Sequence, residues 1–441
     1  MLKRKMTDEL LAWKQTKDHE CLLIKGARQI GKTFIVQHFA EMYYAEEHYF
    51  ELNFLFRPEL IPLFSGDLSI DELTLRMSAF FPGKVFVPEK TLIFLDEIQK
   101  CPQARTALKA FALDNRYDVI ASGSLLGLHF GQDEEVEEEI SSIPVGYEKQ
   151  ITMFPLDLEE FLWARQVGEE IISLLREHFL MCEKVPEELN SLMNQYLREY
   201  IVVGGMPRPV QVFVDSKNYS KVHEEQEKIL ASYSDDIIRH APKSEKQKVK
   251  KVFDSIPRQL ARENRKFRYS VVEARSNARK FGNAVEWLFD SNLAYRCSNL
   301  SLPVFPLTAY AQEDYYKLYM NDPGLLTAMY GFEMKAAILT QTLAGPAKGG
   351  IYENLIASQL AQKGDPLYYY KPDENDQEIE FVISRNAEAI PLEVKSKRGE
   401  TRSLNEFIEN RNPSVAYKLI SGNIGKSGVR ITIPHYMIMF L

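Results

Sequence analysis

The chain has 441 residues, of which 45% are hydrophobic and 26% charged, a balance typical of soluble globular proteins with two to four domains. The net charge is −8, no apolar stretch follows the basic N-terminal residues, and no run of about 18 apolar residues occurs, so we expect neither a signal peptide nor a membrane span. Four widely separated cysteines exclude a disulfide framework and a zinc site, and they predict a cytoplasmic protein.

The first 160 residues alternate apolar, strand-like segments with helical ones. We expect strands over 21–24, 49–53, 91–95 and 118–122, and a helix over 33–43. Strands that are separated by helices predict a parallel sheet with helices on both faces. The predicted fold class is therefore α/β.

The remaining chain becomes helical to about residue 240, then reads as short helices followed by a strand near residue 293. A run of Gly and Pro at 345–350 marks a boundary, after which we expect a helix over 351–362 and three strands. These patterns predict four domains, with the bounds 1–165, 166–242, 243–340 and 341–441.

A phosphate-binding loop follows the first strand. The pattern Gly-x4-Gly-Lys-Thr lies between an apolar strand and a helix, as this motif requires. Its glycines allow backbone N–H groups to approach phosphates, its lysine binds the β- and γ-phosphates, and its threonine ligates Mg²⁺. The alternative is a glycine-rich turn with a chance lysine. The predicted nucleotide-binding residues are Gly26, Ala27, Arg28, Gln29, Ile30, Gly31, Lys32 and Thr33.

A second acidic motif supports ATP and Mg²⁺ as the cofactors. Asp96 and Glu97 end an apolar strand 64 residues after Lys32. Asp96 is expected to hold Mg²⁺ with Thr33, and Glu97 to orient and deprotonate the attacking water. The strand 118–122 would lie beside both, so that Ser122 or Ser124 senses the γ-phosphate; a common serine-glycine turn is the alternative. We predict Lys32, Asp96 and Glu97 as catalytic residues.

With these motifs, the chain resembles the bacterial and archaeal AAA-superfamily ATPases that carry an uncharacterised C-terminal domain. The resemblance implies a P-loop AAA-type core, a helical lid, a winged-helix segment and a smaller nuclease-like α/β domain. It also implies that Pro207 contacts adenine, whereas a helix-breaking turn is the alternative for that segment. The matching segments are 26–33, Leu95-Asp96-Glu97-Ile98-Gln99, 121–124, 154–161, Gly204-Gly205-Met206-Pro207 and 390–395.

One departure concerns an arginine. The family often has Gly-Arg before its Phe-Pro-Leu segment, where this chain has Gly146-Tyr147-Glu148. Arg116 and Arg165 are the candidate substitutes within the chain. A second copy or a protein partner that supplies an arginine finger, worth roughly 10³–10⁵ in rate, is the other option.

Residues 243–280 hold thirteen Lys or Arg against four acids. We expect a recognition helix over 271–280, followed by the start of a wing at 293–297. The basic segment would then bind DNA; pairing with the acidic residues 133–139, or with another subunit, is the alternative. The predicted contacts are Arg258, Arg262, Arg265, Arg275, Arg279 and Lys280.

The C-terminal part contains a second chemical pattern. Glu353 lies early on a helix, Glu380 ends a strand, and Glu393 and Lys395 share one face of the next strand. Carboxylates beside a lysine fit metal-assisted phosphodiester hydrolysis. The arrangement resembles the restriction-endonuclease-like superfamily, with Glu380 where aspartate is commoner. A buried ion pair in a scaffold that has lost catalysis is the alternative.

Two functions follow from these expectations. The first is an ATP-driven switch or motor that binds ATP or ADP and acts on nucleic acid, with a nuclease-like C-terminal domain. The second is a signalling or scaffold ATPase whose C-terminal domain binds protein. Neither involves a membrane.

Overall fold

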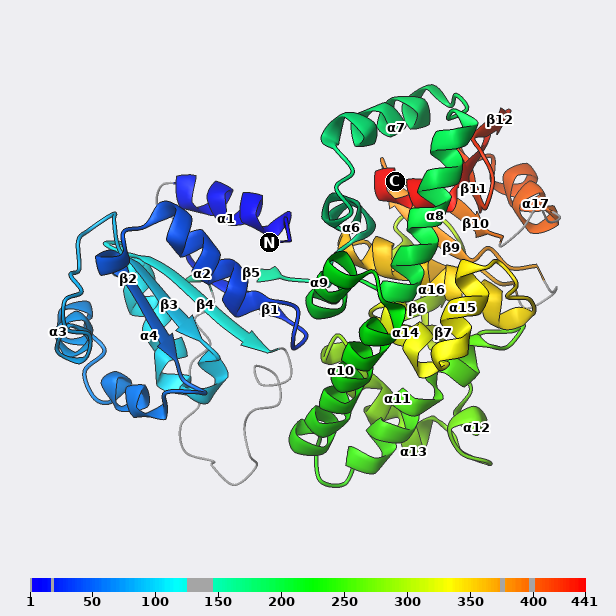
Figure 1. Cartoon of the computed structure of the whole chain (residues 1–441). Helices are drawn as coiled ribbons and strands as arrows, with labels where there is room; N and C mark the ends of the chain where they lie inside the picture. The colour runs from blue at the N-terminus through cyan, green and yellow to red at the C-terminus, as the bar shows by residue number, and fades with distance from the viewer. Residues whose placement is uncertain (1, 17–19, 125–145, 373–376, 396–400) are drawn as a thin grey trace. The chain divides into compact units, whose positions relative to one another are not determined.

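The computed structural model describes residues 2–16, 20–124, 146–372, 377–395 and 401–441. It consists of two compact units, Lys3–Phe154 and a larger one that contains Pro155–Leu441. Figure 1 labels the elements of both units. The acidic run 133–139 lies outside the described residues, so its predicted pairing with the basic segment stays a prediction.

The N-terminal unit is built on a five-stranded parallel sheet with the order β2-β3-β4-β1-β5. Four of these strands match the four predicted segments, although β3 begins one residue later than predicted, and β4 lies between β1 and β3. The strands are β1 Cys21–Gly26, β2 Tyr49–Asn53, β3 Leu92–Asp96, β4 Asp118–Ser124 and β5 Glu148–Thr152. The helices are α1 Met6–Gln15, α2 Lys32–Tyr43, α3 Ile70–Phe80 and α4 Pro102–Asp114, with 3-10 turns η1 Glu46–His48, η2 Pro58–Phe64 and η3 Ile98–Lys100.

Helices cover both faces of this sheet because its central strands β1, β3 and β4 are apolar on both sides. Cys21 and Leu23 of β1 face the core formed with α3 and α4. By strand alternation, Leu22 and Ile24 face the opposite side, where α2 contacts β1, β3 and β4. The carboxyl ends of β1, β3 and β4 therefore meet at one edge, at which α2 begins.

The larger unit begins with helices and ends with a mixed sheet. Its helices are α6 Leu158–Ala164, α7 Glu169–Met181, α8 Glu187–Val203, α9 Pro207–Ser216, α10 Tyr219–His240, α11 Lys246–Leu260, α12 Tyr269–Val272, α13 Ala278–Asp290, α14 Pro323–Met329, α15 Phe332–Leu339, α16 Pro346–Gln362 and α17 Arg402–Arg411, with 3-10 turns η4 Leu307–Tyr310 and η5 His435–Phe440. Its strands are β6 Ala294–Leu300, β7 Ala311–Met320, β8 Leu367–Tyr369, β9 Phe381–Arg385, β10 Glu388–Val394, β11 Ala416–Ile420, β12 Gly425–Ser427 and β13 Arg430–Pro434.

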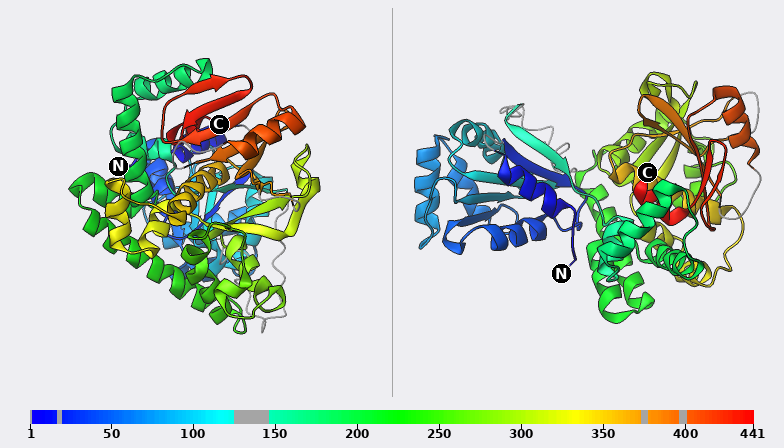
Figure 2. Two further views of the ribbon diagram at one scale, coloured as in Figure 1. Left: turned by 90° about the vertical axis from the view of Figure 1, so that its right-hand side faces the viewer. Right: turned by 90° about the horizontal axis from the view of Figure 1, so that it is seen from above.

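Two sheets organise the C-terminal half. A three-stranded sheet has the order β7-β6-β8, and a five-stranded mixed sheet has the order β12-β13-β11-β10-β9. Both views of Figure 2 show the red strands of the second sheet beside the orange helix α17. Because β8 pairs with β6, the first sheet crosses the predicted boundary at residue 340, and the four-domain division stays a prediction. The α/β fold class, with a parallel P-loop core and a smaller C-terminal α/β domain, is confirmed.

The predicted helix over 271–280 is wrong. Instead, α12 ends at Val272, Glu273 is extended, and a new helix, α13, begins at Ala278. The Ser276 hydroxyl donates to the Glu273 carbonyl at 2.7 Å, and the Asn277 side chain caps α13 by accepting from Lys280 N. Such side-chain bonds to the backbone compete with helical hydrogen bonds, so they end one helix and start the next.

The Gly204-Gly205 segment is packed inside the larger unit. The Gly205 N–H donates to Asp322 Oδ2 at 2.6 Å, and a Cβ at Gly205 would lie 2.0 Å from the Leu156 carbonyl oxygen. Burial raises the pKa of Asp322 to about 6, although hydrogen bonds from backbone N–H groups, including that of Gly205, lower it. The segment is therefore a close-packed turn. Pro207 is the first residue of α9, and its contact with adenine stays a prediction.

Candidate functional site

The phosphate-binding loop connects β1 directly to α2. At Gly26 (φ 156°) a Cβ would lie 2.3 Å from the Met153 carbonyl oxygen and 2.6 Å from Ile30 Cδ1, so no larger residue fits. Gln29 (φ 63°) and Gly31 (φ 91°) have left-handed backbones. This geometry turns the loop tightly before α2, as the N-terminus of a helix that binds phosphate requires. Gly26 to Thr33, including Ala27 and Arg28, all lie on this one connection.

The Lys32 ammonium group folds back over the loop. It donates to the carbonyl oxygens of Gly26 at 3.1 Å and Ala27 at 2.8 Å. The side chain is buried, and burial lowers its pKa to about 8, although Glu97 and Asp96 oppose this shift. Among the described residues, neutral carbonyls alone accept hydrogen bonds from this buried cation. It is therefore suited to exchange them for an anion, because charge-assisted hydrogen bonds are stronger.

Asp96 joins the ends of four elements. Its Oδ2 accepts from Thr33 Oγ1 at 2.9 Å and from Asn53 Nδ2 at 2.7 Å. Its Oδ1 accepts from the Ser122 hydroxyl. Burial raises the pKa of Asp96, whereas the hydrogen bonds from Ser122 and Thr33 lower it. The structure thus brings the loop, β2, β3 and β4 together around one carboxylate, and oxygen ligands of this kind suit Mg²⁺.

Glu97 has a left-handed backbone with φ 57°, which is uncommon for a residue other than glycine. Its Oε2 accepts a hydrogen bond from Gln99 Nε2 at 2.5 Å. Glu97 is half-buried, and it directly follows the Asp96 carboxylate. Backbone strain of this type is characteristic of functional sites.

The structure also identifies residues that sequence reasoning missed or left open. Ser122, rather than Ser124, donates to Asp96; Ser124 is buried on the same strand, 3.5 Å from Gln99 Nε2. Asn53 was not predicted. Its position as a polar residue at the end of a strand could have indicated that it lies near the phosphate loop. Its Oδ1 accepts from two following backbone N–H groups, which fixes the amide toward Asp96.

Of the two candidate arginines, Arg116 does not lie at this site. Arg116 precedes β4, so it lies at the amino end of the sheet, where it pairs with Asp71 at 2.6 Å and Asp114 at 2.7 Å. Arg165 belongs to the larger unit and pairs with Glu199 at 2.8 Å. Arg116 is therefore excluded by its place in the sheet, and an arginine from another chain stays a prediction.

The C-terminal carboxylates are brought together with Lys395. The Lys395 ammonium group lies 2.7 Å from Glu380 Oε1 and 3.5 Å from Glu393 Oε1. Burial raises the pKa of Glu380 to about 7, against the effect of Lys395. Glu353 pairs instead with Arg265 at 2.7 Å and with Lys317. Among the described residues, no three His, Cys, Asp or Glu side chains form a cluster that could hold a metal ion.

The predicted DNA contacts differ in accessibility. Arg258, Arg275, Arg279 and Lys280 are exposed, and Arg262 is half-buried. Lys280 pairs with Glu273. Arg265 is largely buried in its ion pair with Glu353, and its contact with nucleic acid stays a prediction.

Comparisons with protein families match three separate parts of the chain. Residues 18–162 match the model of an AAA domain, residues 194–336 match a domain of unknown function (DUF8612), and residues 348–431 match another (DUF4143). No curated protein matches the chain. Among the described residues, none of the helices has the length and apolar character needed to cross a membrane.

Two solved structures have distant similarity. The Walker-type ATPase PABY2304 of Pyrococcus abyssi is 14% identical, with a TM-score of 0.40, over 75% of this chain and 96% of its own. AMPPCP-bound DnaA from Aquifex aeolicus is 14% identical, with a TM-score of 0.27, over 64% of this chain and 85% of its own. These scores carry no argument about function. The sheet, the phosphate loop and the matched domain together define the N-terminal unit as an AAA-type domain of the P-loop ATPase class.

Proposed function

We propose that the N-terminal unit binds ATP with Mg²⁺ and hydrolyses it to ADP and phosphate. The observation that carries this proposal is the hydrogen bond between Thr33 Oγ1 and Asp96 Oδ2, with Glu97 as the next residue. A hydroxyl and a carboxylate that meet beside a phosphate loop are the two protein ligands that P-loop NTPases use for Mg²⁺.

The residues of the site have separate roles in this proposal. Lys32 exchanges its bonds to the loop carbonyls for bonds to the β- and γ-phosphates. Thr33 and Asp96 hold Mg²⁺, which neutralises charge on the phosphate oxygens. Asn53 and Ser122 keep the Asp96 carboxylate in place.

Glu97 is the proposed general base. Its carboxylate takes a proton from a water molecule, whose oxygen then forms a bond to the γ-phosphorus while the bond to the β-γ bridging oxygen breaks. The products are ADP and inorganic phosphate. Gln99 holds Glu97 Oε2 in the free protein, so that contact must be released or shared when water is bound.

The proposal is tested by phosphate release with Thr33→Val, which removes the hydroxyl and keeps the shape. Because the variant lacks one Mg²⁺ ligand, Mg²⁺-dependent hydrolysis should fall at least about tenfold, as expected for loss of a bond to a charged group. Thr106→Val, at a half-buried position on α4 where the hydroxyl bonds the Pro102 carbonyl of its own helix, is the matched control and should hydrolyse ATP normally. If both variants and the wild type hydrolyse ATP at equal rates, the assignment of Thr33 as a Mg²⁺ ligand is wrong.

We further propose that the ATP cycle acts on nucleic acid through the segment α11 to β7. Two observations support this. Three short helices precede an antiparallel pair, β6 and β7, as in a winged helix, and α13 carries Arg279 on its exposed first turn. Arg275 and Arg258 are exposed and form no ion pair with any residue the structure describes.

Duplex binding as a function of salt tests this role. Each lost phosphate contact should reduce the slope of log affinity against log salt by about one. Arg275→Glu and Arg279→Glu should each weaken binding, while Lys426→Glu, on the exposed strand β12, should leave it unchanged. Absence of salt-dependent binding by the wild type would favour the alternative of a signalling or scaffold ATPase.

A second candidate function concerns the C-terminal domain. Glu393 Oε2 is buried without a hydrogen-bond partner among the described residues, and a metal ion would satisfy it. Glu380 and Lys395 lie beside it, as hydrolysis of a phosphodiester would need. The ion pairs of Lys395 and the separate pairing of Glu353 support the other interpretation, a protein-binding scaffold without nuclease activity.

Incubation of plasmid and single-stranded DNA with Mg²⁺ or Mn²⁺, with and without ATP, separates these two interpretations. A nuclease should cleave, and Lys395→Ala should abolish cleavage because the cation that polarises water is gone. Lys426→Ala is the control. If the wild-type protein leaves DNA intact in every condition, the nuclease interpretation is rejected and the protein-binding scaffold is favoured.

A further inference from the structure

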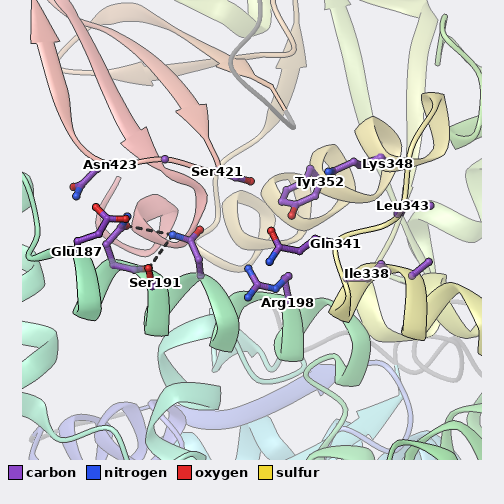
Figure 3. Close-up of a pocket in the computed structure, with 14 residues that line it drawn as sticks. Glu187, Ser191, Arg198, Ile338, Gln341, Leu343, Lys348, Tyr352, Ser421 and Asn423 are labelled. Atoms are coloured by element: carbon purple, nitrogen blue, oxygen red, sulfur yellow. Dashed lines mark hydrogen bonds between the residues drawn. The ribbon is translucent and has the colours of Figure 1, made fainter.

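The larger unit contains a polar cavity of about 730 Å³ that the proposed ATPase does not use. Its lining comes from α8, the end of α15, the connection between α15 and α16, the start of α16, and the turn between β11 and β12. Figure 3 shows this cavity with Arg198, Gln341 and Tyr352 pointing toward one another from three of these elements. Its volume is within the range of cavities that hold small organic ligands.

The face of α8 that lines the cavity is polar along its whole length. The lining positions are spaced by three or four residues, so they form one stripe on the helix. With about 1.5 Å of rise per residue, the stripe extends for about 16 Å. Its members are Glu187, Asn190, Ser191, Asn194 and Arg198.

Positive charge is concentrated at one end of the cavity. Arg198 projects from α8 and forms no ion pair with any described residue, and Lys348 projects from the first turn of α16. The N-terminus of α16, which has 17 residues, adds the positive end of its dipole. Among the lining residues, all of which are described, Glu187 is the one carboxylate, and it lies at the far end of the α8 stripe.

Between the basic end of the cavity and Glu187, the wall includes buried side chains that are held by their own contacts. Tyr352 lies one turn after Lys348 on α16, is buried, and packs on His435 with 4.6 Å between ring centroids. The opposite part of the wall holds Asn190, which is also buried and accepts from the Tyr436 hydroxyl at 3.0 Å. Asn194 also lines the cavity and donates to the Asn190 carbonyl at 2.9 Å, so its side-chain oxygen is not used in that bond.

We propose that this cavity binds a phosphate group carried by a small polar molecule of nucleotide size, separately from the phosphate loop. Arg198 and Lys348 contact the phosphate, since arginine gives the bidentate bonds that phosphate favours. Tyr352 packs against the body of the ligand. Glu187, Ser191 and Asn194 accept hydrogen bonds from its hydroxyl or amino groups at the other end.

Binding of ADP to the full-length Lys32→Ala protein, measured by isothermal titration calorimetry, tests the proposal. This background weakens the phosphate loop, so that a remaining site can be seen. One equivalent of ADP should bind, and adding Arg198→Glu or Lys348→Glu should weaken it at least about tenfold, because the phosphate then meets a negative charge. Lys221→Glu, at an exposed position of α10 that does not line the cavity, is the control and should bind normally.

Competition distinguishes the possible sources of the phosphate. Inorganic phosphate that displaces ADP at similar concentration supports the site and identifies free phosphate as its ligand. Adenosine that displaces ADP equally well overturns the proposal, because adenosine has no phosphate. The proposal is also overturned if the Lys32→Ala protein binds no ADP, or if both charge reversals leave binding unchanged while their thermal unfolding matches that of the Lys221→Glu control.

Discussion

Thr33 and Asp96 lie 63 residues apart in the chain and meet through a hydrogen bond of 2.9 Å. The strands that carry them to this point, β1 and β3, are separated in the sheet by β4. The phosphate loop must therefore cross the end of β4. Ser122 of that strand also reaches Asp96, because β4 pairs with β3 and Ala121 lies opposite Leu95. The contact places the ligands of a nucleotide-bound Mg²⁺ at the carboxyl edge of the sheet, where parallel α/β sheets bind ligands.

The low pKa of Lys32 predicts a pH dependence of nucleotide affinity. Burial lowers this pKa to about 8, so the free protein carries a charged Lys32 below that pH and a neutral one above it. Bound phosphate favours the charged form, and binding must then take up a proton at high pH. Affinity for a fluorescent ATP analogue, measured from about pH 6 to about pH 10, should fall as the pH rises through about 8.

Two variants control this measurement. Lys32→Ala should bind more weakly by roughly tenfold to a hundredfold, the cost of a lost bond to a charged group, and should lose the transition near pH 8. Lys25→Ala, whose ammonium group makes a solvent-exposed hydrogen bond to Gln150, should keep both the affinity and the transition. A transition that persists in Lys32→Ala would assign it to another group.

Ser122 and Ser124 should differ in their effect on the requirement for Mg²⁺. Ser122→Ala removes a hydrogen bond that lowers the pKa of Asp96 and orients its carboxylate. The Mg²⁺ concentration for half-maximal hydrolysis should rise at least about tenfold, because hydrogen bonds to charged groups contribute about 1.5–3 kcal/mol. Ser124→Ala, on the same strand but without a bond to Asp96, should cause a smaller rise. A larger effect at Ser124 would reverse the assignment.

The packing of Gly205 predicts a loss of stability without loss of chemistry. In Gly205→Ala the added methyl group would lie 2.0 Å from the Leu156 carbonyl oxygen, so the backbone must move. The free energy of unfolding, from urea denaturation, should fall by about 1–3 kcal/mol. Gly282→Ala, inside α13 with no atom within 4 Å of the new Cβ, should be neutral or stabilising. Equal midpoints for the two variants would show that the turn at Gly204-Gly205 is not close-packed.

Periodicity and motif spacing were enough to predict the N-terminal fold. The predicted strands 21–24, 91–95 and 118–122 are apolar on both faces, which is the property that buries a parallel strand between helix layers. The segment 49–53 alternates instead, with Tyr49 and Glu51 half-buried. The phosphate loop could also be predicted from the sequence. Its glycines stand where the backbone needs them, because Gly31 has a positive φ and a Cβ at Gly26 would clash with Met153. Asp96 was found for the same reason, as a charged residue directly after an apolar strand.

Other features depend on contacts that a linear pattern does not contain. The break at Ser276 arises from a hydroxyl that bonds the backbone, and the apolar spacing of 271–278 is equally good for one helix. Arg265 belongs to a basic run, yet its partner Glu353 comes 88 residues later. The α8 stripe has the spacing of a solvated face, and only the packing of α15 and α16 converts it into a cavity.

The most direct test of the account is the comparison of Glu97→Gln with the wild type in one preparation, measuring both ATP affinity and the rate of phosphate release. Glu97 does not hold the nucleotide in this account, so affinity should stay within about threefold, a change of less than 1 kcal/mol. Removal of the general base should lower the rate by roughly 10²–10⁴. Unchanged phosphate release by Glu97→Gln, with ATP still bound, would contradict the account.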